Sequence, residues 1–190
     1  MSRTIISNRC PIVTNEESTG FLQTKNGIRY SATVPIEDRR ITNSYFILYN
    51  PLHSMRDIYL SRIIHTNTAD EPVLVRCYCN CCDLLPKNAE RSNRITNNNT
   101  RYCDVPPTAQ LYFGTNIPCI NNTPLLEYAV RSYENFVNEL DGDIILSPGS
   151  YYFEITKGFS CENDREQISS ISWWEQPLRT RCNLVPEIDE

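Results

Sequence analysis

The sequence predicts an all-β protein, an antiparallel, jelly-roll-like β-sandwich with an extended N-terminal arm. The composition favours strands, because 11 tyrosines accompany many Ile, Val and Thr residues and no segment is rich in Ala, Leu or Lys. Short apolar segments alternate with turns, which the 12 prolines and many asparagines mark. About eight to ten such segments suit two packed sheets.

The N-terminal part supplies the first predicted strands. Residues 1–18 are polar and are interpreted as the arm. Segments 21–24 and 28–34 flank Lys25-Asn26-Gly27, a sequence typical of a hairpin turn, and are therefore predicted to pair as strands. The continuous apolar run Tyr45–Tyr49 predicts a buried strand.

The middle of the chain continues this pattern. Strands are predicted at 58–65, 72–80 and 109–113 from alternating or continuous apolar residues. Because side chains alternate along a strand, Cys77 and Cys79 are expected to share one face of the second of these strands. The polar, Asn-rich segment 86–107 is interpreted as a long surface loop with at most a short strand.

Residues 125–140 carry two competing patterns. A strand through Glu127–Tyr133 is one interpretation. The other is a helix, because apolar residues recur with a period of about 3.6. These residues are Leu126, Ala129, Val130, Tyr133, Val137 and Leu140.

The C-terminal part completes the predicted sandwich. Two strands within 143–155 flank the turn Ser147-Pro148-Gly149, and the alternating segment Gln167–Glu175 is the last strand. The sandwich domain is therefore assigned to residues 19–177, and residues 178–190 are interpreted as a polar tail.

Nine cysteines are unusual in a chain whose first ten residues hold no apolar core of a secretory signal. A chain without such a signal normally stays in a reducing compartment, where cysteines serve metals or catalysis. A metal cluster is one explanation, and lysis of the producing cell, which exposes its product to oxygen, is another. The odd count leaves at least one sulfur for a partner outside the chain.

The segment Cys77-Tyr78-Cys79-Asn80-Cys81-Cys82 allows three interpretations. The first is disulfides to other segments, for which Cys77 and Cys79 are candidates together with Cys103, Cys119 and Cys161. The second is a zinc site, although Cys79–Cys82 is the only Cys-x-x-Cys pair of the chain. The third is a redox pair, which needs a following helix that the nearby proline opposes. The disulfide interpretation is preferred, and no metal is expected.

Cys10 and Cys182 lie in the two predicted tails, where burial as small apolar side chains cannot explain them. We expect them to tether separate copies of the chain, with Cys81 and Cys82 as further candidates for inter-subunit disulfides. Trp173 and Trp174 are interface candidates, because one of two consecutive indoles on a strand faces outward.

No pattern of residues indicates catalysis or a cofactor. The two histidines, His53 and His65, are interpreted as surface or turn residues, and Glu127 and Glu154 as solvated charges. The net charge of −5 gives no support for nucleic-acid binding. No apolar segment is long enough to span a membrane. We therefore expect a protein that is not an enzyme, with neither a nucleic acid nor a membrane as partner.

Five parts of the sequence carry a further signal: the run 45–51, Ser54, Ile58–Leu60, Ile145–Gly149 and Ile171–Glu175. They resemble small β-sandwich proteins of the spore surface of Firmicutes. The general plan of a sandwich with cysteine-bearing tails also resembles endospore appendage fibre subunits. This resemblance implies an arm, with Cys10 as its cysteine, that reaches a core or C-terminal cysteine of another copy. It also implies synthesis in the mother cell and a place on the spore surface.

The expected function is that of a structural subunit that self-assembles into a disulfide-cross-linked extracellular fibre or coat on endospores. Its partners are then copies of itself. A jelly-roll adhesin or binding module of a spore or phage surface is the first alternative, because tyrosines and an Asn-rich loop suit contact with carbohydrate. A zinc-binding protein is the second alternative.

Overall fold

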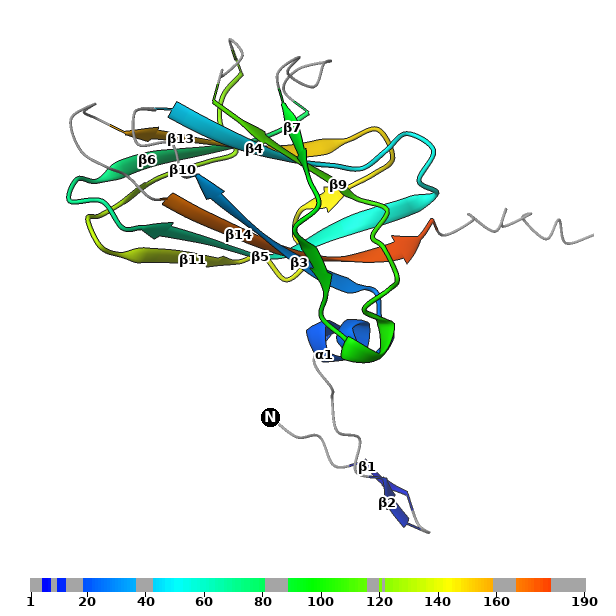
Figure 1. Ribbon diagram of the computed structural model, residues 1–190. Helices are drawn as coiled ribbons and strands as arrows, with labels where there is room; N and C mark the ends of the chain where they lie inside the picture. Colours follow the sequence, from blue (N-terminus) through cyan, green and yellow to red (C-terminus); the bar gives the residue numbers. More distant parts are fainter. Residues whose placement is uncertain are drawn as a thin grey trace, which may run out of the picture.

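The computed structural model describes residues 5–7, 10–12, 19–36, 43–80, 89–115, 120, 122–158 and 167–178. Two antiparallel sheets pack face to face, drawn one above the other in Figure 1 and named here the upper and the lower sheet. The all-β sandwich expected from the sequence is confirmed.

Each sheet contains six strands, and every strand pair is antiparallel. The upper sheet has the order β10 (Leu126–Val130), β6 (Val73–Cys79), β13 (Tyr151–Gly158), β4 (Asn43–Tyr49), β9 (Gln110–Gly114) and β7 (Glu90–Ser92). The lower sheet has the order β11 (Asn135–Glu139), β5 (Arg56–Asn67), β14 (Gln167–Pro177), β3 (Arg29–Ile36) and β8 (Ile95–Asn97), and β12 (Ile145–Leu146) pairs with β5.

The main core lies between the sheets and contains large side chains from both of them. Leu48 and Tyr152 of the upper sheet and Leu60 and Trp173 of the lower sheet are completely buried. Full burial of one such side chain stabilises the fold by about 1.5–3 kcal/mol. Burial of the inward faces of both sheets thus explains the alternating pattern in β5 and β6.

A second apolar cluster covers the outer face of the upper sheet. Tyr45, Ile47 and Phe153 are each 1% exposed, and they pack with residues that include Ala89 and Ile120. The central strands β4 and β13 are therefore buried on both faces, which explains their continuous apolar sequences. The buried strand predicted at Tyr45–Tyr49 is confirmed.

Two short connections cross from one sheet to the other and close the two open sides of the sandwich. Asn93-Arg94 join β7 of the upper sheet to β8 of the lower sheet. Residues 131–134 join β10 to β11 on the other side. There the rings of Tyr128 and Phe136 stack with centroids 3.8 Å apart and fill the space between the two edge strands.

The segment around Gly27 corrects the predicted N-terminal hairpin. Residues 19–25 form helix α1 (Thr19–Lys25) instead of a strand. The amide of Asn26 donates to the Leu22 carbonyl, and Gly27 has a φ of +71°. An Asn-Gly pair serves equally well at the end of a helix, because glycine adopts the left-handed conformation that ends it.

The segment 125–140 forms two strands, β10 and β11, so the predicted helix is wrong and the strand alternative is correct for its first part. Leu126 and Val130 of the predicted helical period pack toward the core, whereas Tyr133 and Val137 are exposed. The period of 3.6 residues thus combined residues from the inner side of β10 with residues of the turn and the outer side of β11. The predicted loop 86–107 likewise contains β7, β8 and a 3-10 helix, η1 (Thr100–Tyr102).

The side chains of both tryptophans in the last strand are buried within the protein, which corrects their assignment as interface candidates. Trp173 is 0% exposed and stacks with Tyr30, and Trp174 is 4% exposed and stacks with Tyr59. The pairing of β14 with β5 shifts register between Ser172 and Trp173, and the turn at Gly142 packs against the Trp174 ring. Neither indole therefore presents a surface to a partner.

Strands β1 (Ile5–Ser7) and β2 (Cys10–Ile12) pair with each other and form a separate two-stranded sheet.

None of the helices in the described part of the chain has the length and the apolar character that a membrane span requires.

Candidate functional site

The cysteines that sequence analysis singled out fall into three groups. The thiols of Cys77, Cys79 and Cys103 are free. Cys10 lies in β2 opposite Ser7, and only its backbone is described. The other candidates lie outside the described residues. They are Cys81, Cys82, Cys119, Cys161 and Cys182.

The three described thiols differ in accessibility. Cys77 is completely buried, Cys79 is partly buried beside it on β6, and Cys103 is exposed. Burial raises the pKa of Cys79 to about 11. Burial, and next the nearby carboxylate of Glu154, raises the pKa of Cys77 further. Since the thiolate is the reactive form, the two strand cysteines are poor nucleophiles and Cys103 is the accessible thiol of the described body.

A metal site is not formed by the described parts of these segments. Within the described ranges, no three or more His, Cys, Asp or Glu side chains lie close enough together to hold a metal ion. The zinc alternative rested on the pair Cys79–Cys82, and Cys82 is outside the described residues.

The most unusual polar feature is a buried network between the two sheets. His65 on β5 and Ser169 on β14 come from the lower sheet, and Glu154 on β13 comes from the upper sheet. The Ser169 hydroxyl lies 2.9 Å from His65 Nδ1 and donates to Glu154 Oε1 over 3.0 Å. His65 Nδ1 is also 3.3 Å from Glu154 Oε1. All three side chains are at most 1% exposed.

Protonated groups of the upper sheet complete the network around the Glu154 carboxylate. The Tyr152 hydroxyl donates to Oε2 over 3.1 Å, and the Cys77 thiol approaches the same oxygen at 3.9 Å. Burial, and next the Glu154 carboxylate, raises the pKa of Tyr152 well above its usual value, and the same causes raise the pKa of Tyr128. These hydroxyls therefore remain protonated over the whole physiological pH range.

The same three residue types form catalytic triads in hydrolases, but the geometry here is different. In a triad, the serine bonds to one imidazole nitrogen and the acid to the other. Here both Ser169 and Glu154 lie against Nδ1 of His65, while Nε2 is buried without a partner. Because Ser169 is only 1% exposed, its hydroxyl is closed to a substrate from solvent. The arrangement joins the sheets and does not form a nucleophile with its base.

A second buried carboxylate fixes a surface loop. Glu175 on β14 is 1% exposed and accepts hydrogen bonds from the backbone amides of Thr108 and Ala109 at 2.9–3.0 Å. Trp173 Nε1 donates to the same carboxylate over 3.3 Å. These bonds hold the end of the loop before β9 against the lower sheet.

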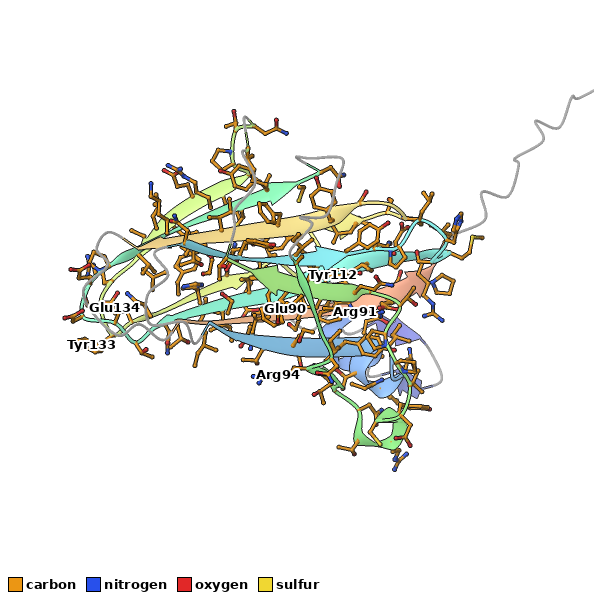
Figure 2. All side chains as sticks on the ribbon, turned by 45° about the horizontal axis from the view of Figure 1, so that its top comes forward. Glu90, Arg91, Arg94, Tyr112, Tyr133 and Glu134 are labelled. Atoms are coloured by element: carbon orange, nitrogen blue, oxygen red, sulfur yellow. The ribbon has the colours of Figure 1, made fainter. Side chains whose placement is uncertain are left out.

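Beside this loop lies a polar surface with two hollows. A groove of about 530 Å³ lies between the β7–β8 connection and residues 103–110, and its lining includes Arg91, Asn93 and Asp104. A hollow of about 410 Å³ is lined by residues 98–102 together with Thr24 and Lys25 of α1. Figure 2 shows Arg91 and Arg94 on this side of the molecule, away from Tyr133 and Glu134.

The family model for a family of unknown function, DUF6143, matches residues 23–180 of the chain. The chain belongs to the DUF6143 family. The comparison with curated proteins gives no match.

The matched range of this DUF6143 protein contains the two buried carboxylates described above, Glu154 and Glu175. Neither of them is among the site residues predicted from the sequence. His65 and Glu154 had been interpreted as surface residues, and this interpretation is wrong because both are 0% exposed. A signal was present in the sequence: Glu154 is the only charged residue in the apolar run Tyr151–Ile155 of β13. A charge inside a doubly buried strand needs internal donors.

Proposed function

We propose that the chain is a structural subunit whose copies assemble into a fibre or coat, of the kind that endospores carry on their surface. Disulfides between cysteines outside the sandwich would join the copies. The supporting observation is the division of the described thiols: on β6, Cys77 is buried and Cys79 partly buried, and both are free, whereas Cys103 on a loop is exposed.

The described part of the sandwich contains no disulfide. Its core spans two sheets, its sides are closed by connections between the sheets, and Cys77 and Cys79 pack as small apolar residues without pairing. The exposed Cys103 on the body, and Cys10 and Cys182 near the two ends of the chain, are therefore proposed as the cysteines that join copies.

The chemistry of assembly requires an oxidant. Two thiols from two copies lose two protons and two electrons to form one disulfide, and dioxygen accepts them as hydrogen peroxide. Such a subunit would remain reduced while it is inside the cell that makes it. It would become cross-linked after lysis exposes it to air.

Electrophoresis of the air-oxidised protein without reductant tests this proposal. We expect a ladder of covalent oligomers that collapses to the monomer when dithiothreitol is added. Cys10→Ser, Cys182→Ser and Cys103→Ser should each shorten the ladder. Cys79→Ser is the matched control and should leave the ladder unchanged, because the Cys79 thiol is shielded and its pKa is raised.

Mass spectrometry of the isolated dimer identifies the bridged residues. A wild-type protein that runs as a monomer without reductant would refute the proposal. So would a ladder that depends on Cys77 or Cys79, because a bond there would require the sandwich to open.

A further inference from the structure

The surface on the β7–β8 side combines features that point to a ligand. We propose that it binds an acidic oligosaccharide, that is, a short sugar chain with carboxylate groups. The binding surface, named here the loop surface, consists of the groove beside Arg91, the hollow lined by Lys25, Arg101 and Tyr102, and Arg94 on the same side of the molecule.

Hydrogen bonds to side-chain amides hold the walls of the loop surface in place. The Asn97 amide donates to the Gly27 carbonyl over 2.8 Å, and its oxygen accepts from the backbone of Asn99 at 2.9 Å. The Asn99 amide in turn donates to the carbonyls of Thr24 and Lys25 at the end of α1. Because Glu175 fixes the opposite wall, the larger groove is formed before any ligand arrives.

The cationic side chains of the loop surface are unpaired. Lys25, Arg91, Arg94 and Arg101 have no hydrogen bond or ion pair from their side chains to any described residue. Three arginines elsewhere pair with glutamates: Arg62 with Glu139, Arg76 with Glu127 and Arg131 with Glu134. Although the chain as a whole carries a charge of −5, these four unpaired cations outnumber the neighbouring Glu90 and Asp104 and make this side locally positive, which attracts an anion.

Tyr102 supplies an aromatic platform beside these cations. Its ring lies against Gly27, where an added Cβ would be 2.4 Å from the Tyr102 Cδ2 atom. The residue is nevertheless 43% exposed. A ring that is fixed on one side and open on the other can stack against the apolar face of a sugar.

The mixture of donors and acceptors favours a sugar over other anions. Asp104 lines the groove together with Arg91 and Asn93, and the Asp104 side chain has no partner among the described residues. Its carboxylate accepts hydrogen bonds from hydroxyl groups, which a sugar carries on every ring. The arginines bind the carboxylates of such a chain.

Amide chemical shifts measured by NMR during titration with trigalacturonic acid test the proposal. The Cys103→Ser protein is used, so that cross-linking cannot interfere with the measurement. We expect shifts at residues 91–104 that saturate, and weaker binding at high salt. Arg91→Ala and Tyr102→Ala should each weaken binding by about tenfold or more, the usual effect of losing one charge-assisted or stacking contact.

Matched controls come from the far side of the sandwich, where Arg131→Ala and Tyr133→Ala remove the same side-chain types from an exposed turn. Both variants should bind like the parent protein. Equal weakening by the controls, or no shifts at all, would overturn the proposal. If tetraglutamate or oligothymidylate binds as well as the acidic sugar, the surface is a general anion site and the sugar assignment falls. Equal binding of uncharged cellotriose would remove the role of the arginines.

Discussion

At the scale of single residues, the position of a side chain relative to the two sheets decides its chemistry. Cys77, Cys79 and Cys103 have the same thiol, but only Cys103 lies outside the sheets and is exposed. Glu154 and Glu127 have the same carboxyl group, but Glu154 is 0% exposed and accepts three side-chain donors, whereas Glu127 pairs with Arg76 at the surface. The same residue type therefore stabilises the interior in one place and is solvated in another.

The raised pKa of Cys79 predicts a pH dependence of stability. The folded state favours the neutral thiol, because burial raises the pKa from 9.0 to about 11. The stabilisation is therefore complete below the pKa of the unfolded thiol and is lost as the pH rises from 9.0 to about 11. Urea unfolding of the wild type and of Cys79→Ala, at about pH 8 and about pH 10.5, measures the effect.

We expect the free energy of unfolding to fall more steeply with pH in the wild type than in Cys79→Ala. Comparing the two slopes removes the contribution of the buried tyrosines, whose raised pKa values affect both proteins. Identical slopes would show that the Cys79 thiol ionises in the folded state as easily as in the unfolded chain.

At the scale of elements, the junction of α1 and β3 is held in place by contacts with a segment that is distant in the sequence. The amides of Gly27 and Ile28 donate to carbonyls of the last turn of α1 at 3.0 and 3.2 Å. The η1 loop then places Tyr102 over Gly27 and Asn99 over the end of the helix. A helix of seven residues is too short to be stable alone, so these contacts maintain it.

Gly27→Ala should therefore destabilise the protein by about 2–4 kcal/mol, as the sum of left-handed backbone strain and a clash with Tyr102. Gly149→Ala is a suitable control, because Gly149 also has a positive φ, +86°, but a Cβ there would meet only the flexible end of Leu52 at 3.2 Å. Its expected cost is about 1 kcal/mol. Thermal or urea unfolding gives both values. Equal costs would mean that Tyr102 moves away easily, which would also weaken its assignment as a platform.

At the scale of the whole molecule, the polar network between the sheets fixes how they pack. Apolar contacts alone allow two sheets to slide, whereas His65, Ser169 and Glu154 satisfy each other in one relative position. The chain connections at the two sides, β7 to β8 and β10 to β11, add covalent links between the same sheets. The sandwich is therefore defined by specific contacts in its centre as well as at its sides.

Glu154→Gln should lower the free energy of unfolding by about 2–4 kcal/mol, because a buried amide replaces an acceptor that several donors share. Glu127→Gln makes the same chemical change at the surface of the same sheet and should cost at most about 0.5 kcal/mol. Urea unfolding at neutral pH measures both. If the two variants are equally stable, the network contributes nothing to the packing of the sheets.

The sequence by itself determined the strands and the class of fold. Alternating or continuous apolar residues in β4, β5, β6, β13 and β14 specify which faces are buried, and turn residues specify where each strand ends. This information is local, so the strands can be predicted without knowing which of them pair. It was insufficient at Gly27 and in 125–140, where one local pattern is compatible with both helix and strand.

Only the tertiary structure decided the role of the polar residues. His65 and Glu154 are 89 positions apart in the sequence, and nothing local shows that they meet. A carboxylate is buried only where other segments supply its donors, and a cation is unpaired only where no neighbour faces it. Both conditions depend on the packing of distant segments, which is the reason that the network and the loop surface could not be predicted from the sequence.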